Sequence, residues 1–319
     1  MRRRRVKIEE RAACYHVVNR VHAREFLFQE EEAEAFCRIM RKTARFCGVE
    51  VITYCVMTNH IHLLVRVPKR KGLSDKELFA RYRDVAAAST FNQVFRQFEL
   101  FEEAGNERGM TQIREKLLAR MFDLSAFMKE LKQRFTQWYN THNACWGRGS
   151  FWADRFKSTV VEGRGYALAT VAAYIDLNPV RANMVDDPKD YRWCGYAAAL
   201  GGNPPAVAGL TVLLQAFLRG KQRGRAGDVL AMYRMLLFGT AQRRGGSITR
   251  EQIEAVFAAE GVLPSWKVGL HKAKWLSSGL AIGGKEFVAE CREALSETLG
   301  LKRQRSGLDG PAEVGWSIL

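Results

Sequence analysis

The sequence has no run of 18 or more apolar residues, which argues against a transmembrane helix because about 20 such residues are needed to cross a bilayer. Its start, Arg2 to Arg5, is followed by Lys7, Glu9 and Glu10 instead of an apolar stretch. That pattern is unlike a secretory signal and typical of a solvated basic arm. There is also no G-x-x-x-x-G-K-[ST] loop, so we expect no P-loop nucleotide site.

Cysteine pairing is absent as well. The seven cysteines are odd in number and none of them stands in a C-x-x-C pair. We therefore expect reduced thiols, several of them in the core, in a cytoplasmic protein. They are Cys14, Cys37, Cys47, Cys55, Cys145, Cys194 and Cys291.

Acidic residues are too few to balance the basic ones. The chain has 50 Lys and Arg against 34 Asp and Glu, a formal charge of +16 and a pI near 9.7. This excess favours polyanionic partners through counterion release. Charge alone leaves DNA, RNA and an anionic membrane surface open. The missing apolar run argues against a spanning helix, and we expect nucleic acid and no membrane as the partner.

The most informative motif is His60-Ile61-His62. Apolar residues alternate with other residues from Ile61 to Val67, which predicts a strand with both histidines on one face. Two neutral imidazoles side by side are half of a metal site. A single H-x-H on a strand can equally be a polar surface pair or a satisfied core histidine.

A second element centres on Tyr174 and Asn178. Residues 166–173 are rich in Ala and Leu without Gly or Pro, which predicts a helix that carries Tyr174 in its last turns. The two residues are four apart and would share a face. Pro179 disfavours the helical conformation at Asn178, so we expect the helix to end or restart there. The plain alternative is an amphipathic helix followed by a turn.

The order of predicted elements gives an α+β fold. The β-α-β-β-α-β-α order, with a Thr58-Asn59 hairpin, is that of a ferredoxin-like split βαβ antiparallel sheet within a domain over residues 1–200. The sheet would present His60 and His62 toward the tyrosine helix. The predicted strands cover 14–20, 49–57, the histidine strand and 153–161, and the helices cover 30–47, 125–142 and the tyrosine helix.

Residues 68–122 are too long for a simple strand-to-helix connection, and their phenylalanines are spaced for an amphipathic helix. We expect a helical insertion packed on the domain, with a DNA clamp as the alternative. The aromatic residues between Trp138 and Trp152 lie close in sequence to Arg148 and Arg155. Most should be core, but aromatics beside cations can also stack splayed bases.

The Ala-, Gly- and Pro-rich residues 201–209 predict a linker, followed by an appended, mainly helical domain over 210–319. Truncation after Gly209 should then leave the active site in place. Residues 219–250 carry the densest positive charge, which makes them the best candidate for binding a DNA hairpin or backbone. The arginines we select there are Arg219, Arg223, Arg225, Arg243 and Arg244.

Three blocks of the chain together resemble the single-tyrosine HUH transposases, most closely the REP-associated tyrosine transposases. They are NHIHLLV (59–65), GSFWADRFKS (149–158) and YIDLNPVRA (174–182), and YHVVNR (15–20) resembles the first strand of that family. The resemblance spans about residues 11–200. It does not extend over the last third of the chain.

By this resemblance, His60 and His62 are ligands of a divalent metal, Mg²⁺ or Mn²⁺, and Asn178 is a third ligand from the tyrosine helix. An amide oxygen suits such a hard cation. Tyr174 is the implied nucleophile, which cuts single-stranded DNA and leaves a 5′-phosphotyrosine link and a free 3′-hydroxyl. A second 3′-hydroxyl can then reseal the strand without ATP.

The resemblance thus predicts a transposase-type single-stranded DNA endonuclease and strand transferase, a monomer or homodimer, acting on hairpin-bearing repeat ends. Arg155, Lys157 and Arg181 in the blocks are candidate DNA contacts. One alternative shares the chemistry: an HUH replication initiator or relaxase. The other is a domesticated nucleic-acid-binding protein that does not cleave, against which the intact His60, His62, Tyr174 and Asn178 argue.

Overall fold

The computed structural model describes residues 6–22, 27–143, 151–217, 229–234, 237, 280–299 and 316–317. These residues contain a six-stranded sheet with the order β2-β3-β1-β4-β5-β6. Its strands are β1 (Ala13–Arg20), β2 (Glu50–Met57), β3 (His60–Val67), β4 (Lys157–Val161), β5 (Ala281–Gly283) and β6 (Trp316–Ser317).

The first four strands form the predicted split βαβ arrangement. Strand β3 lies between β1 and β2 and runs antiparallel to both, while β4 lies antiparallel on the other side of β1. Helix α1 (Glu30–Cys47) connects β1 to β2, and α5 (Leu124–His142) precedes β4. The ferredoxin-like prediction is therefore confirmed. The sheet as a whole is mixed and not wholly antiparallel, because β5 is parallel to β4.

Helix α1 shows why the sequence begins and ends an element where it does. At its start, Gln29 and Glu32 form a reciprocal capping box, and three glutamates in the first turn favour the positive end of the helix dipole. At its end, Gly48 adopts a left-handed conformation with φ 65°. That conformation strains other residues, so glycine suits this C-cap.

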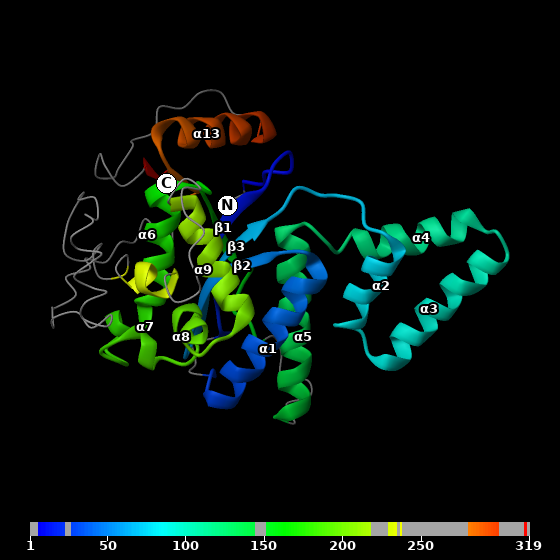
Figure 1. Ribbon diagram of the computed structural model, residues 1–319, viewed down its shortest axis with the longest axis horizontal. Coiled ribbons are helices and arrows are strands. Elements are labelled where there is room, and N and C mark those ends of the chain that lie inside the picture. Colours follow the sequence, from blue (N-terminus) through cyan, green and yellow to red (C-terminus); the bar gives the residue numbers. More distant parts are fainter. Residues whose placement is uncertain are drawn as a thin grey trace.

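Two helical layers cover the sheet, as Figure 1 shows. Helices α1 and α5 pack on one face, where Ile61, Leu63 and Val65 of β3 join the larger core cluster. Helices α6 (Gly165–Asp176), α8 (Gly195–Leu200) and α9 (Pro204–Phe217) pack on the other face with Leu64. The period of two along β3 thus divides its side chains between two cores, and its histidines face α6.

The fourth strand is shorter than predicted. It begins at Lys157 and not at residue 153, and before it Trp152 makes only an isolated bridge to Val21. Phe151 and Trp152 are consecutive, yet both are buried in the core cluster beneath α1 and α5. A regular strand would place them on opposite faces of the sheet, so burying both requires an irregular backbone.

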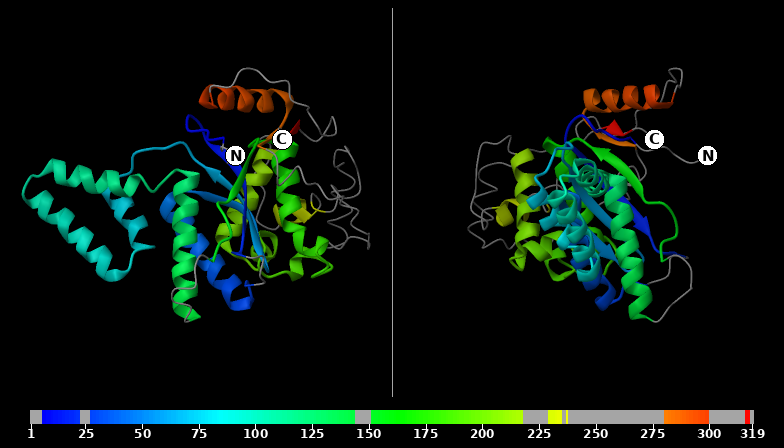
Figure 2. Two further views of the ribbon diagram at one scale, coloured as in Figure 1. Left: turned by 180° about the vertical axis from the view of Figure 1, so that it is seen from behind. Right: turned by 90° about the vertical axis from the view of Figure 1, so that its right-hand side faces the viewer.

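The predicted insertion is confirmed as helical. It consists of α2 (Asp75–Arg83), α3 (Ala88–Glu103) and α4 (Glu107–Leu118), and α3 and α4 project away from the sheet in Figures 1 and 2. Phe79 contacts Phe98 edge-on with 4.9 Å between ring centroids, so the arm has an aromatic core of its own. The alternative role of this arm as a DNA clamp stays a prediction.

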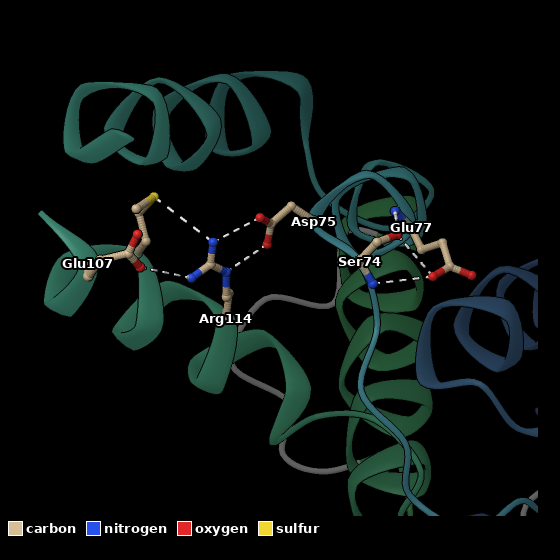
Figure 3. Close-up of polar contacts among 6 residues, drawn as sticks. Ser74, Asp75, Glu77, Glu107 and Arg114 are labelled. Atoms are coloured by element: carbon tan, nitrogen blue, oxygen red, sulfur yellow. Dashed lines mark hydrogen bonds and ion pairs between the residues drawn. The ribbon is translucent and has the colours of Figure 1, made fainter. Parts of the chain in front are cut away.

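Polar contacts fix the helices of the arm relative to one another (Figure 3). The Arg114 guanidinium of α4 donates two hydrogen bonds, of 2.7 and 2.9 Å, to the Asp75 carboxylate of α2. Ser74 caps α2 and forms a capping box with Glu77. A bidentate pair specifies geometry better than a single contact, which suits a projecting element with little other support.

The prediction of a linker over 201–209 is wrong. Asn203 caps helix α9, whose first two residues are prolines, and the helix packs against β2. A Cβ at Gly209 would collide with the carbonyl oxygens of Val51 and Ile52. Small residues and prolines are frequent in linkers, but here they start a helix and allow close helix–sheet contact.

The described residues beyond 210 also do not form a separate domain. Val229, Tyr233 and Leu237 are buried in the same core cluster as α6, and β5 extends the sheet beside β4. Helix α13 (Lys285–Leu299) follows β5 directly. The five arginines selected between 219 and 244 lie outside the described residues.

Within the described ranges, no helix has both the length and the apolar character needed to cross a membrane.

Candidate active site

The two motif histidines lie on the face of β3 that α6 covers. His62 is 3% exposed, whereas His60 is half-buried at the start of the strand, and their rings meet edge-on with 4.9 Å between centroids. Desolvation lowers the pKa of His60 to about 4 and, with the nearby His16 and Arg181 charges, lowers that of His62 well below its usual value. Both imidazoles are therefore neutral at physiological pH and keep a nitrogen lone pair.

A third histidine, His16, completes this cluster. It is buried on β1, and its Nε2 lies 2.9 Å from Nδ1 of His62. The rings are stacked with 5.2 Å between centroids. No spacing in the sequence marks His16 as part of the site, because only the register of β1 on β3 brings it beside His62.

Nδ1 of His60, like Nδ1 of His62, has a hydrogen-bonding partner. Its Nδ1 lies 2.7 Å from Oδ1 of Asn59 in the hairpin turn. If each Nδ1 carries the proton, His60 donates to the Asn59 carbonyl oxygen and His62 donates to Nε2 of His16. The Nε2 atoms of His60 and His62 are then the acceptor atoms, which is the tautomer that outer partners impose on metal-binding histidines.

Tyr174 lies against this cluster, as predicted. It sits near the end of α6, and its ring is edge-on to His62 and His16 with centroid separations of 5.8 and 6.0 Å. The side chain is half-buried. Residues more than 100 positions apart in sequence thus form one cluster.

The tyrosine helix ends just before Asn178, as the following Pro179 predicts. Helix α6 ends at Asp176, and the short α7 (Asn178–Arg181) begins after Leu177. The Asn178 side-chain nitrogen donates to the carbonyl oxygens of Tyr174 and Ile175, at 3.1 and 3.3 Å. These bonds use the donor half of the amide, and its Oδ1 is the group that could bind a cation.

Arg181 lies directly over the tyrosine. Its guanidinium carbon is 4.5 Å from the centroid of the Tyr174 ring. Its Nη1 is buried and has no hydrogen-bond partner among the described residues. A buried guanidinium nitrogen without an acceptor is costly, so this donor is suited to an anionic oxygen supplied by a ligand.

Further cations lie at the same end of the sheet. Arg20 pairs in register with His60, and Lys157 pairs with Val18, which also pairs with His62. Directly paired residues project to the same face, so the exposed Lys157 side chain lies on the histidine face. Arg155, two residues earlier, is also exposed. The surroundings of the cluster are positive, which favours a phosphate.

Behind Tyr174, a buried carboxylate fixes the helix. Asp176 is fully buried and accepts hydrogen bonds from the Thr53 hydroxyl, the Tyr196 backbone N–H and the Tyr233 hydroxyl. Burial raises the pKa of Asp176 to about 6, although these hydrogen bonds oppose the rise. Three separate elements thus hold the end of α6.

The donor set is compatible with a divalent cation, although it contains one amide in place of an acidic ligand. Among the residues that the structure describes, no group of three or more His, Cys, Asp or Glu side chains is arranged as a metal site. The candidate set is instead His60, His62 and Asn178. Its two imidazoles are neutral and each has an outer partner, as ligand histidines require.

Part of the chain matches a known family model. Residues 11–98 match the family model described as "Transposase IS200 like". This segment is therefore similar to an IS200-like transposase domain. The match includes β1, β2 and the histidine strand but ends before Tyr174. No curated protein matches the chain significantly.

Two solved structures are similar to the chain. One is a REP-associated tyrosine transposase bound to a REP hairpin, at 17% identity, covering 65% of this chain and 89% of that chain, with a TM-score of 0.40. The other is a transposase, described as putative, from Deinococcus radiodurans, at 14% identity, covering 58% and 92%, with a TM-score of 0.26.

Proposed function

We propose that this protein is a metal-dependent single-stranded DNA endonuclease and strand transferase with Tyr174 as its nucleophile. The observation that supports the proposal best is the position of that tyrosine, edge-on to His62 at 5.8 Å between ring centroids. A hydroxyl nucleophile beside two neutral imidazoles and a guanidinium suits phosphoryl transfer. The similarity to an IS200-like transposase domain supports the same class of chemistry.

His60, His62 and Asn178 would hold Mg²⁺ or Mn²⁺ through two ring nitrogens and one amide oxygen. His16 and Asn59 would fix the tautomers and ring orientations of the two histidines. When bound, the cation supplies Lewis-acid polarisation of the scissile phosphate.

The tyrosine oxygen would form a bond to phosphorus as the bond from phosphorus to the 3′ oxygen breaks. The phenolic proton passes to water, and the departing 3′ oxygen takes up a proton to become a hydroxyl. The product is a 5′-phosphotyrosine. Attack by a second 3′-hydroxyl on that bond reverses these changes and joins two strands, so no ATP is consumed.

Arg181 would bind a non-bridging oxygen of the same phosphate through its unpartnered Nη1. Its guanidinium lies over the Tyr174 ring and would bring positive charge near the point where nucleophile and phosphate meet. A charge already in place at this point stabilises the transition state more than a mobile surface lysine would. Lys157 and Arg155 would contact adjacent phosphates.

The proposed substrate is single-stranded DNA from hairpin-bearing repeat ends. The charge of +16 favours a polyanion, and the REP-associated structure named above was solved with a REP hairpin. The basic residues between 219 and 250 would contribute backbone contacts, and the protein would act as a monomer or homodimer in the cytoplasm.

The test is a covalent-adduct assay. The full chain is incubated with end-labelled single-stranded DNA from the flanks of its own gene and Mn²⁺, then separated under denaturing conditions. The wild type should form a labelled protein adduct that Tyr174→Phe lacks, because removal of one oxygen removes the nucleophile. Chelator should abolish the adduct, as should His60→Ala or His62→Ala.

Each alternative has its own outcome in this assay. Salt-sensitive DNA binding without an adduct would favour a domesticated, non-cleaving protein. An adduct that persists in Tyr174→Phe would contradict the assignment of the nucleophile, and cleavage that resists chelator would contradict the metal.

A further inference from the structure

A groove of about 750 Å³ lies between α5 and the segment before β4, on the face of the sheet opposite the histidine cluster. The helix contributes Lys129, Gln133 and Gln137 among others, and the segment before β4 contributes Arg155. The remaining lining residues are Ser125, Met128, Lys132, Thr136, Asn140, Trp152 and Phe156. None of these residues carries a carboxylate.

The groove has a floor of buried aromatic side chains and a polar, cationic surface. Trp152 and Phe156 are only 3% and 8% exposed, so they form the floor and offer no free ring face for stacking. The Lys132 ammonium lies 5.6 Å from the centre of the Trp152 ring and donates to the Asp154 carbonyl oxygen at 2.8 Å, which fixes one wall. Lys129, Gln133, Gln137 and Arg155 are exposed above it.

The position of the groove connects it with the active-site end of the sheet. Trp152 bridges to Val21, just after β1, and the Ala153 N–H donates to the Arg20 carbonyl oxygen at 3.0 Å. Two residues after Arg155, Lys157 lies on the histidine face. The segment 152–157 therefore passes around the end of the sheet from the groove to the catalytic side.

We propose that this groove binds the backbone of a single-stranded nucleic acid that continues from the active site. A cationic lining without carboxylates favours phosphates, and glutamine and asparagine amides can hydrogen-bond phosphate oxygens. Because no aromatic face is exposed for stacking, binding depends mainly on contacts to phosphates, which carry no sequence information. The proposal rests on the proposed function only in naming DNA as the polyanion.

The experiment measures binding separately from cleavage. Fluorescence anisotropy with labelled oligodeoxythymidylate in the presence of chelator gives the affinity of the full chain at several salt concentrations. The double variant Lys129→Ala/Arg155→Ala should bind at least several-fold more weakly. Its slope of log affinity against log salt should be flatter by about 1.4, because two contacts to single-stranded phosphates contribute about 0.7 each.

Two further variants make the result specific. Arg38→Ala/Lys42→Ala removes the same charge from exposed positions on α1, outside the groove, and should leave affinity and slope near the wild type. Gln133→Glu keeps the side-chain shape but places an anion in the groove, so it should weaken binding without loss of fold. Oligonucleotides of mixed sequence should show the same losses as oligodeoxythymidylate.

Wild-type affinity and slope in both groove variants would overturn the proposal. So would groove variants that lose binding to a polyglutamate peptide but not to DNA, since the groove would then dock an acidic protein. If the wild type forms the Tyr174 adduct but the groove variants bind DNA as tightly as the wild type, the proposed nuclease activity stands and the groove proposal is wrong. If the groove variants bind DNA more weakly but the wild type forms no adduct, the groove proposal stands and the proposed nuclease activity is wrong.

Discussion

The Tyr233 hydroxyl donates a hydrogen bond of 2.5 Å to the fully buried carboxylate of Asp176, two residues after the proposed nucleophile. Thr53 of β2 donates to the same carboxylate at 2.8 and 2.9 Å. The following residue, Arg234, pairs with Asp187 at 2.6 Å and donates to the Tyr196 hydroxyl. Residues 229–234 are therefore fastened to the tyrosine helix through Tyr233 and to Asp187 and α8 through Arg234.

Tyr233→Phe should destabilise the protein and weaken the positioning of Tyr174. The substitution leaves a buried carboxylate with one donor fewer, which costs about 1 to 3 kcal/mol. Thermal unfolding and the rate of adduct formation measure the two effects. Tyr191→Phe is the matched control, because Tyr191 is also a buried tyrosine but donates to a neutral carbonyl oxygen, that of Val56. Equal losses in both variants would contradict a special role for the Asp176 contact.

Truncation after Gly209 should abolish the folded active site, contrary to what the composition of 201–209 predicts. It would remove Leu210, Leu213 and Leu214 of α9 and Tyr233 from the core cluster around α6. Loss of several large buried side chains costs more than the stability of a typical domain. Circular dichroism should show loss of cooperative unfolding. A truncated chain that melts cooperatively and still forms the adduct would contradict this prediction.

Local patterns predicted much of the fold and part of the site. The alternation around His60 and His62 predicted their strand and common face, and the spacing of Tyr174, Asn178 and Pro179 predicted the broken helix. These features depend on neighbours within a few residues.

Features that depend on distant pairing were not predictable in this way. The role of His16 follows from the register of β1 on β3, which one sequence does not specify. The residues of α9 have the composition of both a linker and a closely packed helix, and only contact with β2 distinguishes the two. The burial of Asp176 depends on donors 20 to 123 residues away.

His16→Ala should weaken metal binding without removing a proposed ligand. Loss of an outer partner of a ligand histidine lowers metal affinity about 10- to 100-fold. The Mn²⁺ concentration that gives half-maximal adduct formation should rise by that factor, and excess Mn²⁺ should restore the rate. Cys14→Ala is the control, because Cys14 is buried on the same face of β1 but has no contact with His62. A lower maximal rate at unchanged metal dependence would contradict this role.

Arg181→Ala should slow adduct formation about 100- to 1,000-fold, the range found when one oriented donor to a developing anion is removed. Arg181→Lys should recover only part of the rate, because an ammonium lacks the planar guanidinium that lies over the Tyr174 ring. In the non-cleaving Tyr174→Phe background, Arg181→Ala should lower the DNA affinity by a far smaller factor than it lowers the rate of adduct formation in the active protein. A proportional loss of rate and affinity would instead assign Arg181 to general backbone binding.

Glu130→Gln should destabilise the protein at neutral pH and much less in acid. Glu130 of α5 accepts hydrogen bonds from Arg120 at 2.8 and 3.0 Å and pairs with Arg134 at 3.1 Å. Burial by itself raises the pKa of Glu130, but the hydrogen bonds and charges of the two arginines outweigh it and lower that pKa below its ordinary value of 4.5.

Because the pKa of Glu130 is lower in the folded state, its stabilising effect is complete above pH 4.5 and is lost as the pH falls through the folded-state pKa. Urea unfolding should therefore show a large difference in the free energy of unfolding between wild type and Glu130→Gln at pH 7. This difference should be smaller at pH 3. Glu99→Gln breaks an exposed pair with Arg96 on the arm and should show almost no gap at either pH. A gap for Glu130→Gln that is the same at both pH values would show that packing, and not the charge of the carboxylate, accounts for the loss.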